Sequence, residues 1–383
     1  MNNLKIAVVS SGAGHINRGV ESWALDLAYS LHNHEQNVTL FKGGGIEQDS
    51  WEKVIKCLKR NDKITLFLEK IFQKKLGGWR YGLNSAVQIE QSSFSIHLLP
   101  YVLNKYDIIH TQETNVAYFF NKLKYKGLSN SLVIFSNGTC KDMEFVKKMS
   151  IVQELSPVRI KMWNDIKNKN IYMIPNFINV NKFRRPEGLI SRKDINIDDN
   201  TIVYLCVGAL TKVLKRIDRM IIEFSIFKKR IQSKSILLII GGREPDTQEI
   251  IDLKQSLIPD DCIIMENVNR KYMPDLYNLS DVFVLPSDHE MLPISVLEAM
   301  SAELPIISND TPILQWVIDG GGLIKDLSKE GILSELLIQM LDKNTRIKYK
   351  NTAFMRVNNI FSDQVVIPQI IDMYKDVYNK YHG

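Results

Sequence analysis

The sequence has few of the features that mark secreted, membrane-spanning or metal-binding proteins. Its 383 residues include only four cysteines, which lie far apart and in no paired metal-ligand spacing. We therefore expect reduced thiols and a cytoplasmic protein. No apolar run reaches the ~18 residues needed to cross a bilayer. The first residues lack the charged and apolar regions of a signal peptide, and no repeat or low-complexity tract is present.

The sequence has a net excess of charge in only one segment. The formal net charge is +6, and residues 51–80, which hold nine Lys/Arg and three Asp/Glu, account for all of it. A nucleic-acid-coating protein is basic over a wider area, so we expect no nucleic-acid partner. Trp51, Phe67, Phe72 and Trp79 lie among the lysines, which makes the segment a candidate for peripheral membrane contact. A solvated helix pair with ordinary apolar inner faces is the alternative.

The chain opens with a strand, a loop, a helix and another strand. Residues 6–9 are apolar and β-branched, apolar residues then recur at helical spacing from Ile16 to Leu31, and residues 38–41 are again strand-like. Further short apolar runs follow at residues 96–99, 108–109, 132–135 and 171–174. Strands that alternate with helices predict a parallel sheet covered on both faces.

The same alternation begins again after residue 200, with strand-like runs at residues 202–207, 236–240, 263–264, 282–285 and 306–307. The stretch before it is polar and contains Pro186 and Gly188. We therefore predict an N-terminal domain over 1–180, a linker over 181–199, a second domain over 200–360 and a C-terminal helix over 361–383. This last helix is a candidate to fold back on the first domain. Ligands of such sheets bind at the carboxyl ends of the strands.

The most informative segment follows the strand at residues 282–285. Glu290 lies on a polar loop before a predicted helix, Pro293 suits the first turn of that helix, and Glu298 lies inside it. A helix start attracts phosphate through its free N–H groups. A ligand with hydroxyls at both ends and a diphosphate between them, such as a nucleotide sugar, suits this order. The alternative is that Glu290 caps the helix and Glu298 is solvated.

This segment resembles the donor-site signature of glycosyltransferase family 4, whose fold is called GT-B. The matching residues are 282–287, Glu290, Pro293, 297–300 and 304–307. The resemblance implies an α/β protein with two Rossmann-like domains whose parallel sheets face each other across a cleft. It also implies that Glu290 contacts the donor sugar and Glu298 the ribose hydroxyls. The backbone around Leu292 and Ile294 would approach the diphosphate. Glu303 departs from the family, which usually has glycine there.

Residues 207–216 resemble a second family pattern, a strand followed by Gly-Arg-Leu and a later Lys whose cations neutralise the donor diphosphate. Lys215 fits the Lys position, whereas Ala209 stands at the Arg position. Arg216 or Lys212 is therefore a candidate to compensate. Positive charge near a helix start is unfavourable unless an anion sits there, which favours a binding role for Lys215 over a merely solvated one.

Four further residues match family positions. Arg243 ends the next strand, in a loop close to the nucleotide, although a plain turn is an equal alternative. Gly19 fits a turn that approaches the donor phosphates. His110 ends a strand, where bonding to a backbone carbonyl is the alternative role. Asn137 stands where many members have a catalytic-site histidine, and an amide can donate a hydrogen bond to a sugar but cannot take a proton at neutral pH.

The resemblance implies a retaining hexosyltransferase that moves a sugar from a UDP- or GDP-sugar to a glycan, lipid-linked or other small acceptor, as in cell-surface polysaccharide biosynthesis. Glu290, Lys215 and Asn137 are the expected catalytic residues, with Lys215 stabilising the departing diphosphate. No Asp-x-Asp pair occurs, so we expect no metal, and no cofactor beyond the nucleotide-sugar co-substrate. We expect the protein to be located in the cytoplasm, where the inner face of the membrane is a second candidate location. A non-catalytic GT-B partner or scaffold protein and a nucleotide-sugar epimerase are the alternatives.

Overall fold

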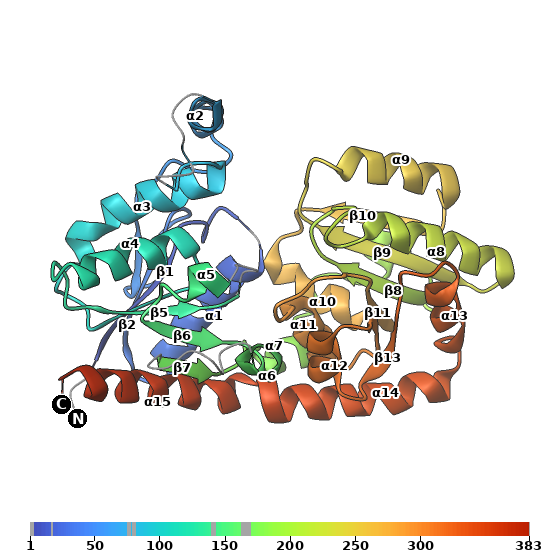
Figure 1. The fold of residues 1–383 in the computed structure, drawn as a ribbon. Coiled ribbons are helices and arrows are strands. Elements are labelled where there is room, and N and C mark those ends of the chain that lie inside the picture. Colours follow the sequence, from blue (N-terminus) through green and yellow to red (C-terminus); the bar gives the residue numbers. More distant parts are fainter. Residues whose placement is uncertain are drawn as a thin grey trace. The chain divides into compact units, whose positions relative to one another are not determined.

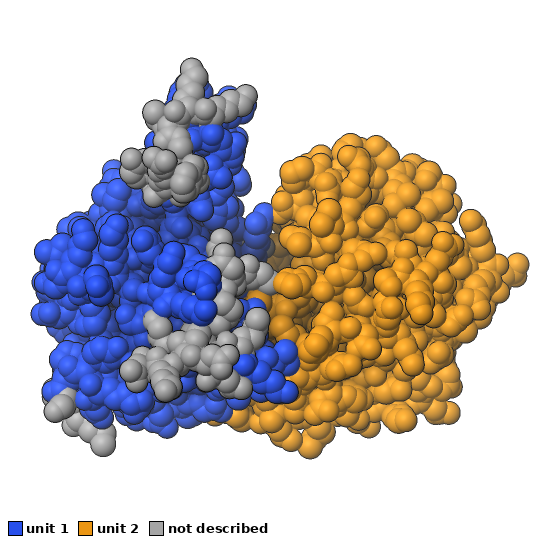
Figure 2. All heavy atoms as spheres, viewed as in Figure 1, with its two compact units in different colours: residues 1–175, 367–383 blue, residues 176–366 orange. Residues whose placement is uncertain are grey.

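The computed structural model describes residues 4–16, 18–74, 78, 82–138, 143–161 and 170–382. The chain divides into two compact units, shown in separate colours in Figure 2: unit 1 comprises residues 1–175 and 367–383, and unit 2 comprises residues 176–366. The expected linker over 181–199 thus lies within unit 2. Most of the expected C-terminal helix is assigned to unit 1.

Unit 1 contains a seven-stranded parallel sheet in the order β3-β2-β1-β4-β5-β6-β7 (Figure 1). Its strands are β1 Lys5–Ser10, β2 Asn37–Lys42, β3 Glu52–Val54, β4 Ile108–Thr111, β5 Leu132–Ser136, β6 Ile151–Glu154 and β7 Asn170–Met173. Its helices are α1 Gly19–Asn33, α2 Lys63–Lys74, α3 Ala86–Val102, α4 Thr114–Tyr125, α5 Met143–Val146, α6 Pro157–Ile160 and most of α15 Asp363–His382.

Helices cover both faces of this sheet, as the alternating pattern predicts. Phe94 of α3 and Phe120 of α4 are fully buried in one cluster with Ile109 of β4. Because strand side chains alternate between faces, the next residue, His110, points to the other face. There its ring meets Trp23 of α1 and Tyr374 of α15. The order of β1 and β4 in the sheet makes their boundary a topological switch point, where such folds bind ligands.

One predicted strand is wrong: residues 96–99 lie inside helix α3. The apolar run is only four residues long, which cannot distinguish a strand from a buried helix segment. The helix is fixed by buried Phe94, Leu98 and Val102 at four-residue spacing and by Ser85, whose side chain caps its start. The short strands β3, β6 and β13 were also not predicted, although β6 contains the buried apolar pair Ile151-Val152.

Unit 2 contains a six-stranded parallel sheet in the order β10-β9-β8-β11-β12-β13. Its strands are β8 Ile202–Val207, β9 Ser235–Gly241, β10 Cys262–Glu266, β11 Val282–Leu285, β12 Ile306–Asn309 and β13 Gly322–Lys325. Its helices are α7 Val180–Arg184, α8 Ile217–Arg230, α9 Thr247–Leu257, α10 Met273–Asn278, α11 Ile294–Ser301, α12 Pro312–Ile318, α13 Ile332–Gln339 and α14 Lys343–Arg356. Short helical turns occupy Lys193–Ile195, Arg270–Tyr272 and Val357–Phe361.

The predicted apolar face of α8 forms the centre of this unit's core. Ile217, Met220, Ile221 and Phe224 are fully buried against strand residues such as Leu237. Here β8 and β11 are neighbours across the switch point, so the loops that follow their carboxyl ends lie side by side. These are the loops that carry Lys215 and Glu290.

The cysteines that the structure describes, Cys57, Cys206 and Cys262, form no disulfide. Burial raises the pKa of each thiol to about 12, so all three are inert thiols at neutral pH. Cys140 lies outside the described residues. None of the described helices combines the length and the apolar composition that a bilayer crossing requires.

Candidate functional site

The candidate site of unit 2 consists of the two loops after β8 and β11. The ammonium of Lys215 forms an ion pair with the Glu290 carboxylate, and the guanidinium of Arg216 forms one with Asp288. Ser287 Oγ donates to the carbonyl of Leu214 over 2.8 Å. Three polar contacts thus join the loops, and they bring together Lys215, Arg216 and Glu290.

Local backbone geometry sets the position of Lys215. A Cβ on Gly208 would lie 3.3 Å from Cγ of Lys215, and one on Gly241 would lie 2.0 Å from the Gly208 carbonyl oxygen. Glycine at 241 is therefore required for the β9 end to approach this loop. Arg216 adopts a left-handed conformation, with φ of 55°, immediately before helix α8. The loop ends in that strained residue, whose side chain reaches Asp288.

Helix α11 places Glu298 and the expected phosphate-facing backbone. Pro293 is the N-cap with extended backbone, one position before the helix, and Ile294 is the first helical residue. The first N–H groups of a helix have no partner within it, so they remain available to an anion. Leu292 accepts a hydrogen bond on its carbonyl from Asn176 Nδ2 over 3.4 Å. Glu298 is 8% exposed, and its Oε2 accepts from the Tyr277 hydroxyl over 2.7 Å.

Two cations that the sequence places near the donor interact with other acids. Arg243 lies 2.8 and 3.1 Å from the two carboxylate oxygens of Glu266, and its side chain is 55% exposed. Lys212 forms an ion pair with Glu249 of α9. Sequence analysis missed Asp288, whose second oxygen accepts from Asn309 Nδ2 over 2.8 Å. Its place two residues before Glu290, on the same polar loop, was the available signal.

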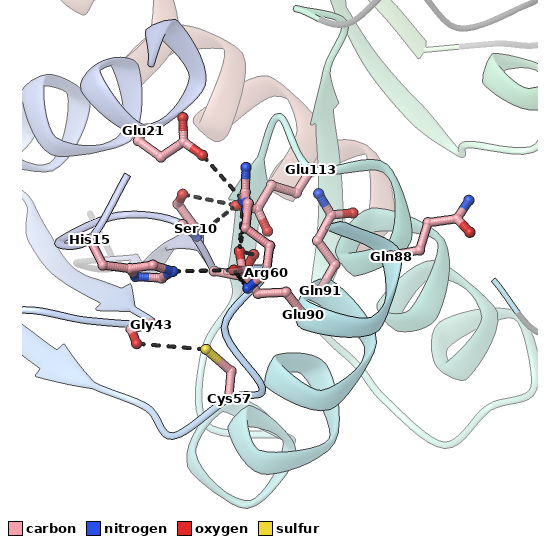
Figure 3. A network of polar contacts seen from close by, with 12 residues as sticks. Ser10, His15, Glu21, Gly43, Cys57, Arg60, Gln88, Glu90, Gln91 and Glu113 are labelled. Atoms are coloured by element: carbon pink, nitrogen blue, oxygen red, sulfur yellow. Dashed lines mark hydrogen bonds and ion pairs between the residues drawn. The ribbon is translucent and has the colours of Figure 1, made fainter. Parts of the chain in front are cut away.

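Unit 1 has its own polar cluster at the β1–β4 switch point, drawn in Figure 3. Oε1 of Glu113, which follows β4, accepts from Ser10 Oγ at 2.9 Å and from the Gly12 amide at 3.3 Å. A Cβ on Gly12 would lie 2.3 Å from Oε1 of Glu21, so position 12 requires a residue without a side chain. Gly19 is the first residue of α1, and its predicted contact with the donor stays a prediction.

A buried ion pair holds this cluster together. Arg60 donates to Glu90 through its backbone amide at 2.6 Å, Nε at 3.0 Å and Nη2 at 2.6 Å, and Nη2 also lies 3.3 Å from Glu21. His15 Nε2 lies 3.2 Å from Glu90. Burial alone would raise the pKa of Glu90, but the bonds from His15 and Arg60 outweigh it and lower the pKa to about 2. The basic segment 51–80 is thus not uniformly a surface, because Arg60 is 9% exposed.

The pKa of Glu113 is raised, whereas that of Glu90 is lowered. Glu113 is fully enclosed, and this burial, with the nearby Glu21 carboxylate, raises its pKa to about 7 despite the hydrogen bonds from Ser10 and Ser11. Its second oxygen, Oε2, has no hydrogen-bond partner among the residues that the structure describes. The cluster therefore holds a carboxyl group that changes charge near neutral pH.

His110 and Asn137 are enclosed within unit 1. His110 Nδ1 lies 2.7 Å from the Tyr374 hydroxyl, and burial lowers the pKa of the imidazole to about 3, so the ring is neutral. Asn137 Nδ2 donates to Glu154 Oε1 over 2.9 Å. Both side chains are 0% exposed in this structure. Their expected roles toward a donor sugar stay predictions.

Comparisons with known proteins find similarity to glycosyltransferases. Residues 189–354 match the family model described as Glycosyl transferases group 1. The chain is 26% identical over 219 residues to alpha-galactosylglucosyldiacylglycerol synthase of Streptococcus pneumoniae, covering 55% of this chain and 56% of the relative. It is 27% identical over 219 residues to UDP-Gal:alpha-D-GlcNAc-diphosphoundecaprenol alpha-1,3-galactosyltransferase of Escherichia coli, covering 54% of each. The match thus spans little more than half of either relative.

The fold match extends over nearly the whole chain. Sucrose-phosphate synthase from Thermosynechococcus elongatus superimposes with a TM-score of 0.77 at 18% identity, covering 98% of this chain and 100% of that one. The chain therefore has the GT-B fold, as its sequence resemblance implies. The matched family region contains the loops after β8 and β11 and helix α11.

Proposed function

We propose that the protein is a retaining glycosyltransferase that moves a hexose from a UDP- or GDP-sugar to a glycan or lipid-linked acceptor, without a metal ion. The observation that carries the proposal is the Lys215–Glu290 pair, which lies at the switch point of the sheet inside the matched family region. Family 4 membership, the retaining course and the cytoplasmic setting at the inner membrane face belong to the same proposal.

The site residues of unit 2 would each have a separate role in the proposed reaction. The Lys215 ammonium would stabilise the negative charge that develops on the departing diphosphate, and the first N–H groups of α11 would add to it. Glu290 would orient the sugar through hydrogen bonds to its hydroxyls. Glu298, already bonded to Tyr277, is held in one orientation, as a ligand for ribose hydroxyls must be. Arg216 replaces the cation missing at Ala209.

A transferase is favoured over the two alternatives. Both curated relatives reported above carry names of sugar-transferring enzymes, which we would not expect if this chain were an epimerase. A scaffold protein has no need to keep Lys215 and Glu290 paired on loops at the switch point. Ala209 and Asn137 are then departures within a working site rather than signs of lost activity.

Helix α2 supports a lipid-linked acceptor and a membrane contact. Figure 1 shows it standing off the sheet of unit 1. Ile64, Leu66 and Phe67 are 64%, 42% and 63% exposed, and Lys63 and Lys70 lie on the same side of the helix as Phe67. Exposed apolar and basic side chains on one helix suit an anionic bilayer surface. The two curated relatives, by name, act on a diacylglycerol lipid and on a diphosphoundecaprenol.

The test is turnover with defined donors. The purified protein would be incubated with UDP-galactose, UDP-glucose or GDP-mannose, with and without a lipid acceptor, and release of nucleoside diphosphate measured. We expect one donor to be consumed, and Glu290→Gln to abolish its consumption while the melting temperature is unchanged. Glu249→Gln, which removes a carboxylate outside the site, is the matched control and should retain activity. The proposal would be refuted if the protein neither bound nor consumed any of these donors.

A further inference from the structure

Unit 2 has a second hollow, separate from the loops that carry Lys215 and Glu290. It encloses about 340 Å³ and lies between α7, α10, the segment after α11 and the first half of α14. Its lining includes Asp281 and Pro305, which precede β11 and β12. The donor-site loops instead follow the carboxyl ends of their strands. A four-residue strand such as β11 is about 13 Å long, so the two sites lie at opposite edges of one sheet.

Four cations and two carboxylates line this hollow, which we call the Glu303 hollow. The cations are Arg184, Lys343, Arg346 and Lys350, and the carboxylates are Asp281 and Glu303. The two acids are already neutralised. Glu303 lies 3.1 Å from Arg184 and 3.0 Å from Lys350, and Asp281 lies 2.9 Å from Arg192, which is not part of the lining. The hollow therefore has a surplus of positive charge.

Lys343 and Arg346 carry that surplus. Arg346 donates to the carbonyls of Met340 and Leu341 at 2.6 and 2.9 Å, which fixes its guanidinium. Within the described ranges, neither Lys343 nor Arg346 forms an ion pair with a carboxylate, although the charge of Asp342, the N-cap of α14, acts on Arg346. Both lie in the first turn of α14, where the helix dipole is already positive, and α14 has five cations and no acid. Such a cluster is stabilised by a bound anion.

Glu303 connects two cations that line the hollow. It occupies a left-handed position, with φ of 60°, where family 4 sequences usually have glycine. A glutamate accepts that conformation only where its surroundings hold it, and here two cations do so. The Glu303 carboxylate thus holds Arg184 and Lys350 at the wall of the hollow. Backbone strain of this kind is concentrated at functional sites.

We propose that the Glu303 hollow binds the phosphate group of a phosphomonoester. Lys343 and Arg346 would contact the phosphate oxygens, since paired cations recognise that group by charge-assisted hydrogen bonds. Leu304, Pro305 and Ile347 line the same hollow and offer an apolar wall to the carbon part of the ligand. The volume fits a molecule the size of glycerol phosphate or a sugar phosphate. A soluble metabolite and a phosphatidate headgroup carry the same group.

The binding experiment uses the full chain and glycerol 3-phosphate, titrated in a calorimeter with saturating UDP present to occupy the donor site. We expect saturable binding, weakened about tenfold or more in the double variant Lys343→Gln/Arg346→Gln, because two charged contacts are lost. The control, Lys329→Gln/Lys348→Gln, removes the same charge from exposed positions outside the hollow and should bind as the wild type does. Because Arg346 also supports two carbonyls, Lys343→Gln alone is measured as well.

A second set of measurements identifies the source of the phosphate. Vesicles of phosphatidic acid and of phosphatidylcholine are compared by sedimentation with the same variants. Binding of glycerol 3-phosphate, or of phosphatidic acid vesicles alone, supports the proposal if it depends on Lys343. Equal weakening in the control variant, or no saturable binding to either probe, overturns it. Binding that is lost in Lys215→Ala but kept in Lys343→Gln/Arg346→Gln assigns the phosphate to the donor site and overturns it too.

Discussion

Lys215 and Glu290 form an ion pair between two loops that follow neighbouring strands of the unit 2 sheet, β8 and β11. The Lys215 side chain is 23% exposed and that of Glu290 is 9% exposed, so the pair is partly accessible to solvent. A diphosphate that approaches Lys215 must compete with the Glu290 carboxylate for the same ammonium. The two residues on which the proposed function depends are therefore coupled, and their substitutions should act on nucleotide binding in opposite directions.

Lys215→Ala should weaken UDP or GDP binding about tenfold or more, because a charge-assisted contact to the diphosphate is lost. Glu290→Gln should bind the same nucleotide at least as tightly as the wild type, since the competing carboxylate is gone, although transfer is abolished. Titration calorimetry of both variants measures this, with Lys234→Ala as a control for loss of an exposed lysine that pairs with Asp198 outside these loops. Weaker nucleotide binding in Glu290→Gln would contradict the assigned competition.

Glu303 allows a stability test that separates backbone strain from ion pairing. It is the residue after the α11 C-cap, where the Leu304 amide bonds to the Ala299 carbonyl over 2.9 Å and φ at Glu303 is 60°. Glu303→Ala keeps the strain and loses the ion pairs, whereas Glu303→Gly loses both. The glycine variant should therefore be more stable than the alanine variant by about 1 kcal/mol in urea unfolding.

The control for Glu303 is an exposed position inside a helix. At Lys348 of α14, glycine should be less stable than alanine by about 1 kcal/mol, which is the opposite order. If alanine were also the more stable replacement at Glu303, the left-handed geometry assigned there would be wrong.

Sequence reasoning found what depends on local order along the chain. Alternating strands and helices predicted both sheets, and the spacing around Glu290 and Lys215 led to the loops that the structure places together. It missed contacts between distant segments. Arg60 was counted as part of a basic surface, yet it is buried because Glu90, thirty residues later, accepts three of its hydrogen bonds. Asp288 escaped notice because only the fold brings Arg216 next to it.

The membrane hypothesis predicts a loss of binding from one exposed aromatic residue. Phe67→Glu should weaken binding to phosphatidylglycerol vesicles about thirtyfold or more, because the burial of one phenylalanine contributes about 2 kcal/mol and the new charge repels the lipid. Phosphatidylcholine vesicles should bind the wild type weakly, since they lack the charge that Lys63 and Lys70 recognise. Tyr125→Glu changes another exposed aromatic residue of unit 1, 91% exposed, and should have no effect. Equal losses in both variants would argue against α2 as the contact.

Glu113 predicts a pH dependence with a definite sign. Its pKa is about 7 in the folded protein against 4.5 as the ordinary value, so the folded state keeps a proton that the unfolded chain releases. The group's contribution to stability is fully present below pH 4.5 and is lost as the pH rises toward 7, by about 3 kcal/mol in total. The groups that act on this carboxyl are Glu21, Arg60, Cys57, Ser10 and Ser11.

Glu113→Gln isolates this contribution, because the amide has the same shape and does not titrate. Urea unfolding of both proteins between pH 5 and pH 8 should show the wild type losing stability relative to the variant as the pH rises. His110, whose pKa is lowered to about 3, changes stability in the opposite direction below pH 6.5, but it is present in both proteins and cancels in the difference. A difference that stays constant across this range would mean that Glu113 is ionised throughout, and that Ser10 and the Gly12 amide bind a carboxylate.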